Sequence, residues 1–283
     1  MTYREFEFFA KERIKKSCPD TELDGAVVSF WARTLLSHFC GLSQNEILTL
    51  RENEISAEKE TLLEKALCEL IEGEPLQYIL GEWEFYGYRI FCGRGCLIPR
   101  PETELICDEA KKHLGDGARF LDLCTGSGCI SVAALLETKD TSCVSIDISD
   151  DALAYATKNA DYHNLRERME IVKSDALTYI PNEYFDVIVS NPPYIKSGDM
   201  ASLEKNVLRE PHIALDGGED GLIFYRRITE NCKDSLRVGG VLIFEAGYDT
   251  ADGVYEIVKN AGLLAEIICD FSGNKRMVVG VKA

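Results

Sequence analysis

The chain lacks a long apolar run where a targeting or anchoring segment would begin. Its first residues, Met1 to Glu7, interleave charged side chains with aromatic ones. A signal peptide and a membrane-spanning helix both require an unbroken apolar stretch, which this segment does not provide. We therefore expect a cytoplasmic protein that does not enter a membrane.

The sequence also lacks the ligand spacings of a structural metal site. Its 11 cysteines include no Cys-x-x-Cys pair, and its 4 histidines form no His-x-x-x-His pair. Cys92 and Cys96 have no second cysteine pair with which to complete a tetrahedral zinc site. We therefore expect no metal ion, and we expect most cysteines to be reduced, buried and small apolar residues.

Positive charge is scarce relative to negative charge. Lys and Arg number 31 against 48 Asp and Glu, so the formal net charge is −17. This sign opposes broad attraction to nucleic acid or to an anionic membrane. Apolar residues make up 46% of the 283 residues. That is enough for a sizeable core, in two domains or in one large α/β domain with an appendage.

Residues 1–80 carry the periodicity of helices. Asp24 or Asp20 is expected to cap one helix, and Gly41 followed by Ser43 predicts that one helix stops and another starts. Apolar residues recur at steps of three and four at Leu62, Leu63, Ala66, Leu67, Leu70 and Ile71. The pattern predicts a small helical domain.

The pattern changes twice after residue 80. Residues 81–102 are rich in aromatic residues and glycine, which predicts a β-hairpin linker. Across residues 103–283 short apolar runs alternate with amphipathic stretches, which predicts an α/β domain of mostly parallel strands with crossover helices, as in a Rossmann-like fold. The last two apolar runs, 264–269 and 276–281, are joined by a turn too short for a helix. They should form a terminal antiparallel hairpin.

Small residues follow the strand that ends at Asp122. They are Cys124, Thr125, Gly126, Ser127 and Gly128. Such a turn lets backbone N–H groups approach a ligand at the carboxyl end of a parallel strand. The third glycine of a dinucleotide site and the lysine of a phosphate-binding loop are both missing. These absences favour a nucleoside cofactor without phosphate, such as S-adenosylmethionine.

Two aspartates follow later strands of the same domain. Asp147 ends the next strand, where its carboxylate can accept hydrogen bonds from both ribose hydroxyls. Asp175 is expected to end a third strand and to place Ala176 against the adenine ring. Each feature alone has a plainer explanation, since a glycine turn is ordinary structure and such an aspartate is often a helix cap. Their order in successive strand and helix units favours the cofactor.

The segment Asn191-Pro192-Pro193-Tyr194 follows the apolar strand 185–190, beside the expected cofactor. The Asn191 side-chain carbonyl and the Pro192 backbone carbonyl can each accept one N–H of a planar amide or aromatic amine. The prolines fix the backbone, and Tyr194 offers a flat face. A simple turn is the alternative. The buried strand before the segment favours an N-methyltransferase that uses these residues for catalysis and substrate binding. Glu245 is either a polar neighbour of this site or a structural residue.

Further motifs accompany this corner. They are Glu74 to Gly81, Ile98-Pro99-Arg100-Pro101-Glu102-Thr103-Glu104, Glu210-Pro211 with Gly217-Gly218, and Ser272-Gly273-Asn274. With them the chain resembles the release factor glutamine methyltransferases, the PrmC/HemK family, over nearly its whole length. The resemblance implies methyl transfer from S-adenosylmethionine to the glutamine amide in the Gly-Gly-Gln motif of class-1 peptide chain release factors. It also implies that the helical domain grips the factor and that Arg100 borders the site.

Two positions depart from the family pattern, because Cys124 stands where glycine is common and Ala176 where tryptophan is frequent. The Asn-Pro-Pro-Tyr segment also resembles adenine methyltransferases of DNA and RNA, but the acidic charge disfavours them. A protein that binds the cofactor without catalysis is a third possibility, which the intact Asn191 corner disfavours. We expect a monomer whose partner is a release factor and which makes no direct contact with nucleic acid.

Overall fold

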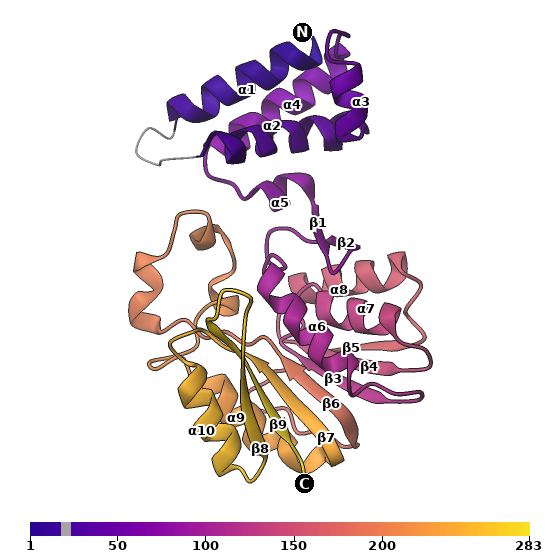
Figure 1. Ribbon diagram of the computed structural model, residues 1–283, viewed down its shortest axis with the longest axis vertical. Coiled ribbons are helices and arrows are strands. Elements are labelled where there is room, and N and C mark those ends of the chain that lie inside the picture. The colour runs from indigo at the N-terminus through magenta and orange to yellow at the C-terminus, as the bar shows by residue number, and fades with distance from the viewer. Residues whose placement is uncertain (18–23) are drawn as a thin grey trace. The chain divides into compact units, whose positions relative to one another are not determined.

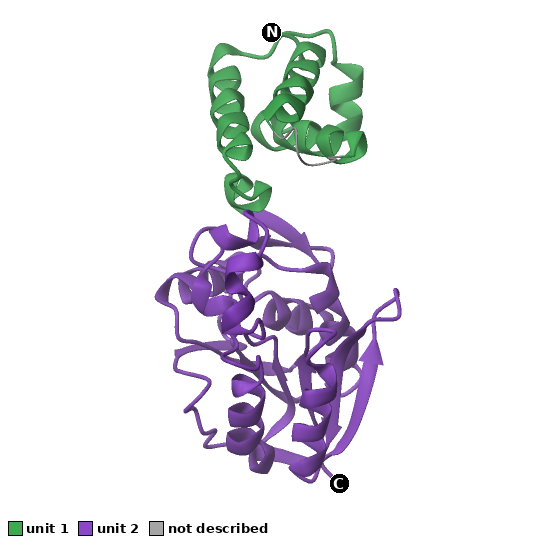
Figure 2. Ribbon diagram, turned by 90° about the vertical axis from the view of Figure 1, so that its left-hand side faces the viewer, with its two compact units in different colours: residues 1–81 green, residues 82–283 purple. Residues whose placement is uncertain are grey.

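The computed structural model describes residues 1–17 and 24–283 of the chain, which form two compact units. The first unit comprises residues 1–81 and the second residues 82–283, each coloured separately in Figure 2. Asp20, one of the two expected helix caps, lies outside the described residues. Among the helices that are described, none combines the length and the apolar character needed to cross a membrane.

The first unit is helical, as the periodicity predicted. Its elements are α1 (Tyr3–Ser17), α2 (Gly25–Cys40), α3 (Gln44–Thr49), α4 (Ala57–Ile71) and α5 (Leu76–Leu80). Helices α1, α2 and α4 pack on one another through fully buried side chains such as Phe6, Leu35 and Leu67. Leu62, one of the periodic apolar residues, lies on the outer face of α4 and is 44% exposed. The stripe that faces the core is therefore narrower than the sequence pattern.

The expected helix ends are confirmed within this unit. The side chain of Asp24 accepts a hydrogen bond from the Ala26 N–H at the start of α2. Gly41 ends α2 in the left-handed conformation (φ 68°), which glycine adopts without steric cost. Ser43 and Glu46 then form a reciprocal capping box at the start of α3.

The second unit begins with the predicted hairpin, β1 (Glu82–Phe85) and β2 (Tyr88–Phe91). Its two turn residues, Tyr86 and Gly87, both have positive φ, the geometry that matches the twist of a tight hairpin. A tyrosine is unusual in this conformation. Its backbone N–H donates to Glu104 (2.8 Å) and its hydroxyl donates to Asp108 (2.6 Å), so it is held against the helix that follows.

A seven-stranded sheet forms the centre of the second unit (Figure 1). Its strands are β3 (Arg119–Leu123), β4 (Ser142–Asp147), β5 (Met169–Lys173), β6 (Phe185–Ser190), β7 (Leu236–Glu245), β8 (Leu264–Cys269) and β9 (Lys275–Val281). Their spatial order is β5-β4-β3-β6-β7-β9-β8, with β3 to β7 parallel and β9 antiparallel to both of its neighbours. The predicted sheet and terminal hairpin are therefore confirmed.

Helices cover both faces of this sheet. Helices α6 (Glu104–Lys111), α7 (Cys129–Glu137) and α8 (Asp150–Tyr162) pack on one face, and α9 (Ile223–Cys232) and α10 (Ala251–Asn260) pack on the other. Successive strand residues point to opposite faces. Phe120 accordingly lies in the core under α6 to α8, whereas Leu121 lies in the core under α9 and α10. The result is a three-layer α/β/α unit.

The connections between β6 and α9 are irregular. They contain the short 3₁₀ helices η2 (Ser197–Ser202), η3 (Val207–Arg209) and η4 (His212–Ala214), whereas η1 (Pro101–Thr103) precedes α6 and η5 (Lys233–Ser235) precedes β7. After β3 the chain moves outward through β4 to β5, and then returns to the other side of β3 as β6. The strand order therefore reverses between β3 and β6. In open α/β sheets, ligands bind at the carboxyl ends of the strands at such a reversal.

Candidate functional site

A pocket opens at the carboxyl ends of β3, β4, β5 and β6. It contains about 840 Å³ of space, counting the part that is open to solvent. Loop residues that directly follow these four strands line it, together with residues 95–97, Pro211, Ile213, Ala214 and Phe224. The pocket therefore coincides with the reversal of strand order, and segments more than a hundred residues apart in the sequence form its walls.

The glycine turn after β3 forms one side of the pocket through Cys124 and Gly126. Cys124 has φ 60°, a left-handed conformation that costs a side-chain-bearing residue roughly 1–2 kcal/mol. Glycine would adopt this conformation without that cost, and Cys124 stands where the family commonly has glycine. Gly128 is also left-handed, and a Cβ there would lie 2.9 Å from Met169 and 3.2 Å from Ala156. Only glycine permits that close approach of α7 to its neighbours.

Two other residues of the turn support it without reaching the pocket. The Thr125 N–H donates to Ile146 O (2.9 Å) and its hydroxyl donates to Asp122 (2.6 Å), so Thr125 fastens the turn to β3 and β4. Ser127 is buried, and its carbonyl oxygen accepts a hydrogen bond from the Asn159 amide (2.9 Å). Neither residue is part of the lining, although the sequence placed both in the cofactor site.

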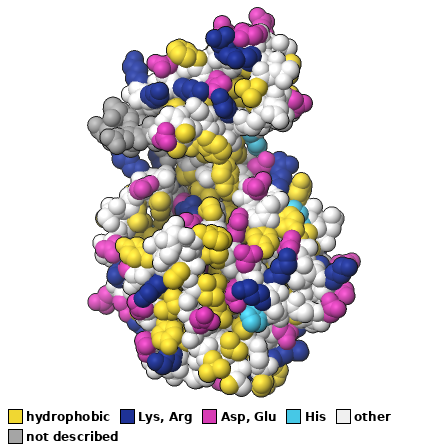
Figure 3. All heavy atoms as spheres, in the orientation of Figure 1, with side chains coloured by type: hydrophobic (Ala, Val, Ile, Leu, Met, Phe, Trp, Pro, Cys, Tyr) yellow, Lys and Arg dark blue, Asp and Glu magenta, His cyan; other side chains and the backbone are white. Residues whose placement is uncertain are grey.

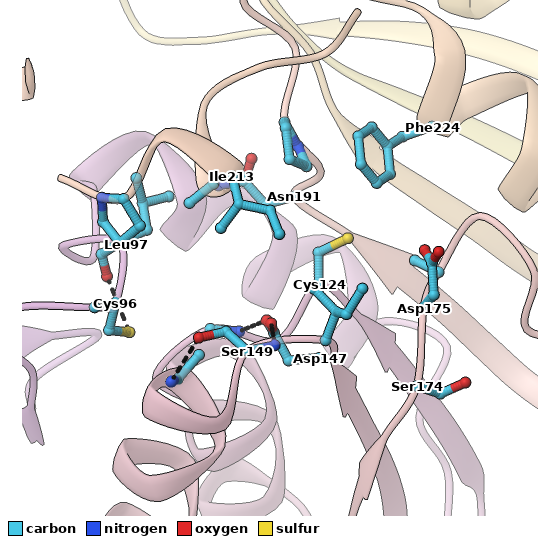
Figure 4. A pocket seen from close by; sticks show the side chains of 18 of the residues that line it. Cys96, Leu97, Cys124, Asp147, Ser149, Ser174, Asp175, Asn191, Ile213 and Phe224 are labelled. Carbon is cyan, nitrogen blue, oxygen red and sulfur yellow. Dashed lines mark hydrogen bonds between the residues drawn. The ribbon is translucent and has the colours of Figure 1, made fainter.

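Asp147, the last residue of β4, presents its carboxylate at the floor of the pocket (Figure 4). One oxygen accepts the Gly126 N–H and the other accepts the Ser149 N–H, each at 2.9 Å. Burial raises the pKa of this carboxyl, while its backbone hydrogen bonds oppose that shift. The two N–H groups hold the carboxylate in one orientation and leave further lone pairs free to accept from a ligand.

The loop after β5 contributes Asp175 and Ala176 to the lining. The prediction that Asp175 ends the strand was wrong by two residues, because β5 ends at Lys173. Past that point the backbone leaves the sheet, and the Asp175 side chain accepts a hydrogen bond from the Leu177 N–H (2.9 Å), which forms a local turn. Ala176 is buried and lines the pocket together with Leu177.

Asn191 lines the pocket directly after β6 (Figure 4). Its side-chain Nδ2 donates to Thr103 Oγ1 (3.1 Å), and the Thr103 hydroxyl donates to Glu245 Oε2 (2.6 Å). Pro193 joins the lining, whereas Pro192 is buried and is not part of it. In Figure 4, Cys124 lies between Asp147 and the Asn191 side of the pocket. The structure thus brings the predicted cofactor turn and the predicted reacting corner into one cavity.

Tyr194 and Arg100 lie outside the lining. Tyr194 packs against the core on the α9 and α10 face of the sheet, and burial raises the pKa of its hydroxyl to about 12. Arg100 forms an ion pair with Glu210, whose other carboxylate oxygen accepts the Ile98 N–H (3.0 Å). Because Glu210 is buried, this pair fastens the segment before α6 to the loop after η3.

Several lining residues were missed by the sequence analysis. They are Gly95, Cys96, Leu97, Ile148, Ser149, Ala152, Ser174, Leu177, Pro211, Ile213, Ala214 and Phe224. Pro211 belongs to a motif that carried the family resemblance, so a signal for that loop existed. Phe224 lies in α9, and its sequence pattern is that of an ordinary amphipathic helix. Only the folded chain brings its ring to the cavity.

The chemistry of the lining suits S-adenosylmethionine. The lining residues that the structure describes include the carboxylates of Asp147 and Asp175 but no Lys, Arg or His. A phosphate-bearing ligand would meet negative charge here, whereas a sulfonium and an ammonium group would be attracted by it. Apolar side chains, among them Ile148 and Leu177, are available to enclose an adenine ring.

Comparisons with known proteins agree with this assignment. The family model of the methyltransferase small domain matches residues 101–244, and that of the PrmC N-terminal domain matches residues 11–81. A release factor glutamine methyltransferase of Thermodesulfovibrio yellowstonii is 36% identical over 88% of this chain and 90% of its own. One of Caulobacter vibrioides is 36% identical over 96% of this chain and 94% of its own.

A solved structure extends the likeness of the fold. The catalytic domain of hMettl16, in complex with a MAT2A 3'UTR hairpin, superposes with a TM-score of 0.56. The match covers 81% of this chain and 83% of that one at 15% identity. At this identity the likeness concerns the fold, and it supports the assignment of the second unit to the methyltransferase fold.

Gly217 supports the Asn191 corner from outside the pocket. Its N–H donates to Ile195 O (2.8 Å), and a Cβ at this position would lie 2.7 Å from Pro193 O. We expect Gly217→Ala to displace the corner, to lower methyl transfer about tenfold or more, and to lower the free energy of unfolding by about 1–3 kcal/mol. The matched control is Gly115→Ala, since a Cβ there meets nothing within 4 Å. Equal activity and equal urea stability of the two variants would contradict this packing argument.

Glu245 makes folding stability depend on pH. Burial raises the pKa of its carboxyl from 4.5 to about 7, opposed by the Thr103 hydrogen bond and nearby Arg276 and Arg100, while Glu102 adds to the rise. The folded protein therefore retains a proton that the unfolded chain releases, so this stability is present below pH 4.5 and is lost as the pH rises through about 7.

The variant Glu245→Gln removes this titration. Its free energy of unfolding relative to wild type should rise between pH 5 and pH 8 by on the order of 3 kcal/mol, measured by urea unfolding. The exposed Glu167→Gln serves as the control, for which we expect no comparable slope. A flat difference for Glu245→Gln would mean that this carboxyl titrates alike in the folded and unfolded chains.

Proposed function

Since the chain belongs to the family of release factor glutamine methyltransferases, we propose that it transfers a methyl group from S-adenosylmethionine to a glutamine of a class-1 peptide chain release factor. The acceptor is the side-chain amide nitrogen of the glutamine in the Gly-Gly-Gln motif. The observation that carries the proposal is the position of Asn191, which lies at the pocket with its amide nitrogen already bonded to Thr103.

On this proposal the cofactor lies across the ends of β3, β4 and β5. The Asp147 carboxylate accepts from the ribose hydroxyls, and Ala176 with Leu177 encloses the adenine. The backbone of the turn at Cys124 and Gly126 packs against the remaining part of the molecule, with Thr125, Ser127 and Gly128 holding that turn in shape. When bound, S-adenosylmethionine supplies an electrophilic methyl group on a sulfonium.

The protein's part in the reaction is to position a weak nucleophile. An amide nitrogen is planar and its lone pair is delocalised, so the approach angle matters. The Asn191 side-chain carbonyl and the Pro192 carbonyl each accept one N–H of the glutamine amide, and this fixes the nitrogen before transfer. Proton release can follow the methyl transfer, so the corner needs no strong base at the start. Pro193 and Tyr194 brace the corner, and Arg100 braces the neighbouring segment through Glu210.

We further propose a division of labour along the chain. Residues 1–80 would bind the release factor, 81–102 would act as the linker, and 103–283 would carry the reaction. The match of residues 11–81 to the PrmC N-terminal domain supports this assignment. So does the exposed aromatic side chain of Phe8 (68%), which a protein partner could contact.

The proposed setting is translation termination in the cytoplasm. Nine of the cysteines that the structure describes, all but Cys96, are free thiols, which fits a reducing compartment. Acidic and basic side chains are interspersed on the face shown in Figure 3, and the net charge is −17, which favours a protein substrate over nucleic acid. The pocket is built from residues 95–224 of one chain, which fits action as a monomer.

The proposal is tested by mass spectrometry of a purified release factor after incubation with the protein and S-adenosylmethionine. We expect one added methyl group on the Gly-Gly-Gln glutamine. Asn191→Ala should lower transfer by about 10²–10³-fold, as loss of one preorganised hydrogen bond does in other active sites. Its affinity for the cofactor, measured by calorimetry, should stay nearly unchanged.

Three outcomes would contradict the proposal. Added methyl groups on RNA or DNA, with none on the release factor, would indicate an adenine methyltransferase. Tight cofactor binding without transfer to any of these substrates would indicate a binding protein. An equal loss of transfer and of cofactor affinity in Asn191→Ala would show that Asn191 mainly holds the cofactor.

The ribose assignment of Asp147 has its own test. In Asp147→Asn the charged acceptor is lost, although an amide oxygen remains for one backbone N–H. We expect KM for S-adenosylmethionine to rise about tenfold, while kcat at saturation changes little. The exposed Asp116→Asn is the control, with an expected KM equal to that of wild type. An unaltered KM in Asp147→Asn would remove this assignment.

A further inference from the structure

Three polar side chains form a buried chain of hydrogen bonds that ends at the pocket. Glu245 is the last residue of β7, Thr103 is the last residue of η1, and Asn191 follows β6. Thr103 Oγ1 lies 2.6 Å from Glu245 Oε2, and Asn191 Nδ2 lies 3.1 Å from Thr103 Oγ1. Thr103 and Glu245 are each 2% exposed. Water therefore does not replace these contacts.

The chain of hydrogen bonds has a defined direction. Above pH 7 the Glu245 carboxyl is ionised and can only accept, so it fixes the hydroxyl hydrogen of Thr103 towards itself. Thr103 Oγ1 is then left with lone pairs alone on the side of Asn191. Only the NH₂ end of the Asn191 amide can bond to it, and the carbonyl oxygen is turned the other way. Because Asn191 lines the pocket, its carbonyl oxygen is available to a ligand.

Thr103 does not serve the role that its place in the helix suggests. It stands at the N-cap of α6, where a threonine hydroxyl commonly accepts a backbone N–H of the first turn. No such side-chain bond is present here. The hydroxyl bonds instead to side chains that are 88 and 142 residues away in the sequence. A purely local role in starting the helix would not produce this arrangement.

The backbone of Glu245 is held in place beside Thr103. The Tyr225 hydroxyl donates to the backbone carbonyl of Glu245 (2.9 Å). Glu245 also pairs with Met277 across the antiparallel strands β7 and β9. Removing a carboxylate from water is costly unless a specific partner rewards it. Thr103 donates a hydrogen bond to that side chain, and where Glu245 is ionised this bond determines which way the Thr103 hydroxyl points.

We propose that Thr103 and Glu245 are positioning residues that keep the Asn191 amide oriented with its carbonyl oxygen towards the substrate nitrogen. The substrate class that this orientation selects is a planar nitrogen with N–H groups to donate. If the Asn191 amide were turned by 180°, its NH₂ group would face the NH₂ group of the substrate. The hydrogen bond from the substrate to the Asn191 carbonyl oxygen would then be lost. The assignment of that nitrogen to glutamine rests on the function proposed above, whereas the orientation itself rests on the three side chains alone.

The matched pair Thr103→Val and Thr103→Ser tests the proposal in the full-length protein. Valine keeps the shape and removes the hydroxyl, whereas serine keeps the hydroxyl and removes the methyl group. We expect kcat for transfer to a release factor to fall about 10- to 100-fold in Thr103→Val and to stay within about threefold of wild type in Thr103→Ser. Cofactor affinity by calorimetry should be equal in all three proteins, which also shows that the variants fold.

A second readout needs no substrate. The side-chain amide signals of Asn191 in ¹⁵N-labelled protein are assigned by their absence in Asn191→Ala. The hydrogen-bonded amide proton should exchange with water about tenfold faster or more in Thr103→Val, and at nearly the wild-type rate in Thr103→Ser. Glu245→Gln should shift the same signals, because an amide at position 245 no longer fixes the direction of the Thr103 hydroxyl.

The outcomes separate this proposal from the function on which it builds. Unchanged amide exchange in Thr103→Val would overturn the positioning role, whatever the activity. Equal loss of kcat in the serine and valine variants would also overturn it, since that result would make packing of the methyl group responsible. If wild type transfers no methyl group to the release factor but the amide exchange behaves as expected, the proposed orientation of the Asn191 amide is supported and the proposed substrate is wrong.

Discussion

Parallel pairing of β4, β3 and β6 is the constraint on which the site depends. Strands that run in one direction must end at one edge of the sheet, so the loops that follow them meet there. The acidic end of β4, the glycine turn after β3 and the Asn191 corner after β6 are separated by tens of residues in the sequence. Hydrogen-bonded register places them side by side. The methyltransferase chemistry of the family follows from that adjacency.

Much of this arrangement could be predicted from the sequence because it rests on local rules. Short apolar runs of strand length predicted β3, β4, β6 and the terminal hairpin, and a helix crossover is the usual link between parallel strands. Asp147 could be placed at a strand end because an apolar run stops there. The left-handed turn at Cys124 could be anticipated through the family, since glycine is common at that position and the observed φ is 60°.

The remainder of the site depends on contacts that no local pattern encodes. Phe224 and Ile213 line the pocket through loops and a helix that approach it only after folding. Glu245 was identified at a strand end, but neither role suggested for it could be chosen from the sequence. Its partner is Thr103, 142 residues away, in the 98–104 motif that supported the family resemblance. The roles of these residues depend on burial and on long-range hydrogen bonds, and both exist only in the folded chain.

We propose that Asn191 offers its carbonyl oxygen to a planar nitrogen at the end of β6. The most direct test is a crystal structure of the protein with S-adenosylhomocysteine and a release factor bound, refined at a resolution that distinguishes the ends of the amide through its hydrogen-bond partners. We expect the substrate glutamine nitrogen within hydrogen-bond distance of Asn191 Oδ1 and of the Pro192 carbonyl, while Asn191 Nδ2 still donates to Thr103. A complex in which the glutamine lies elsewhere, or in which the Asn191 NH₂ faces it, would contradict this role of Asn191.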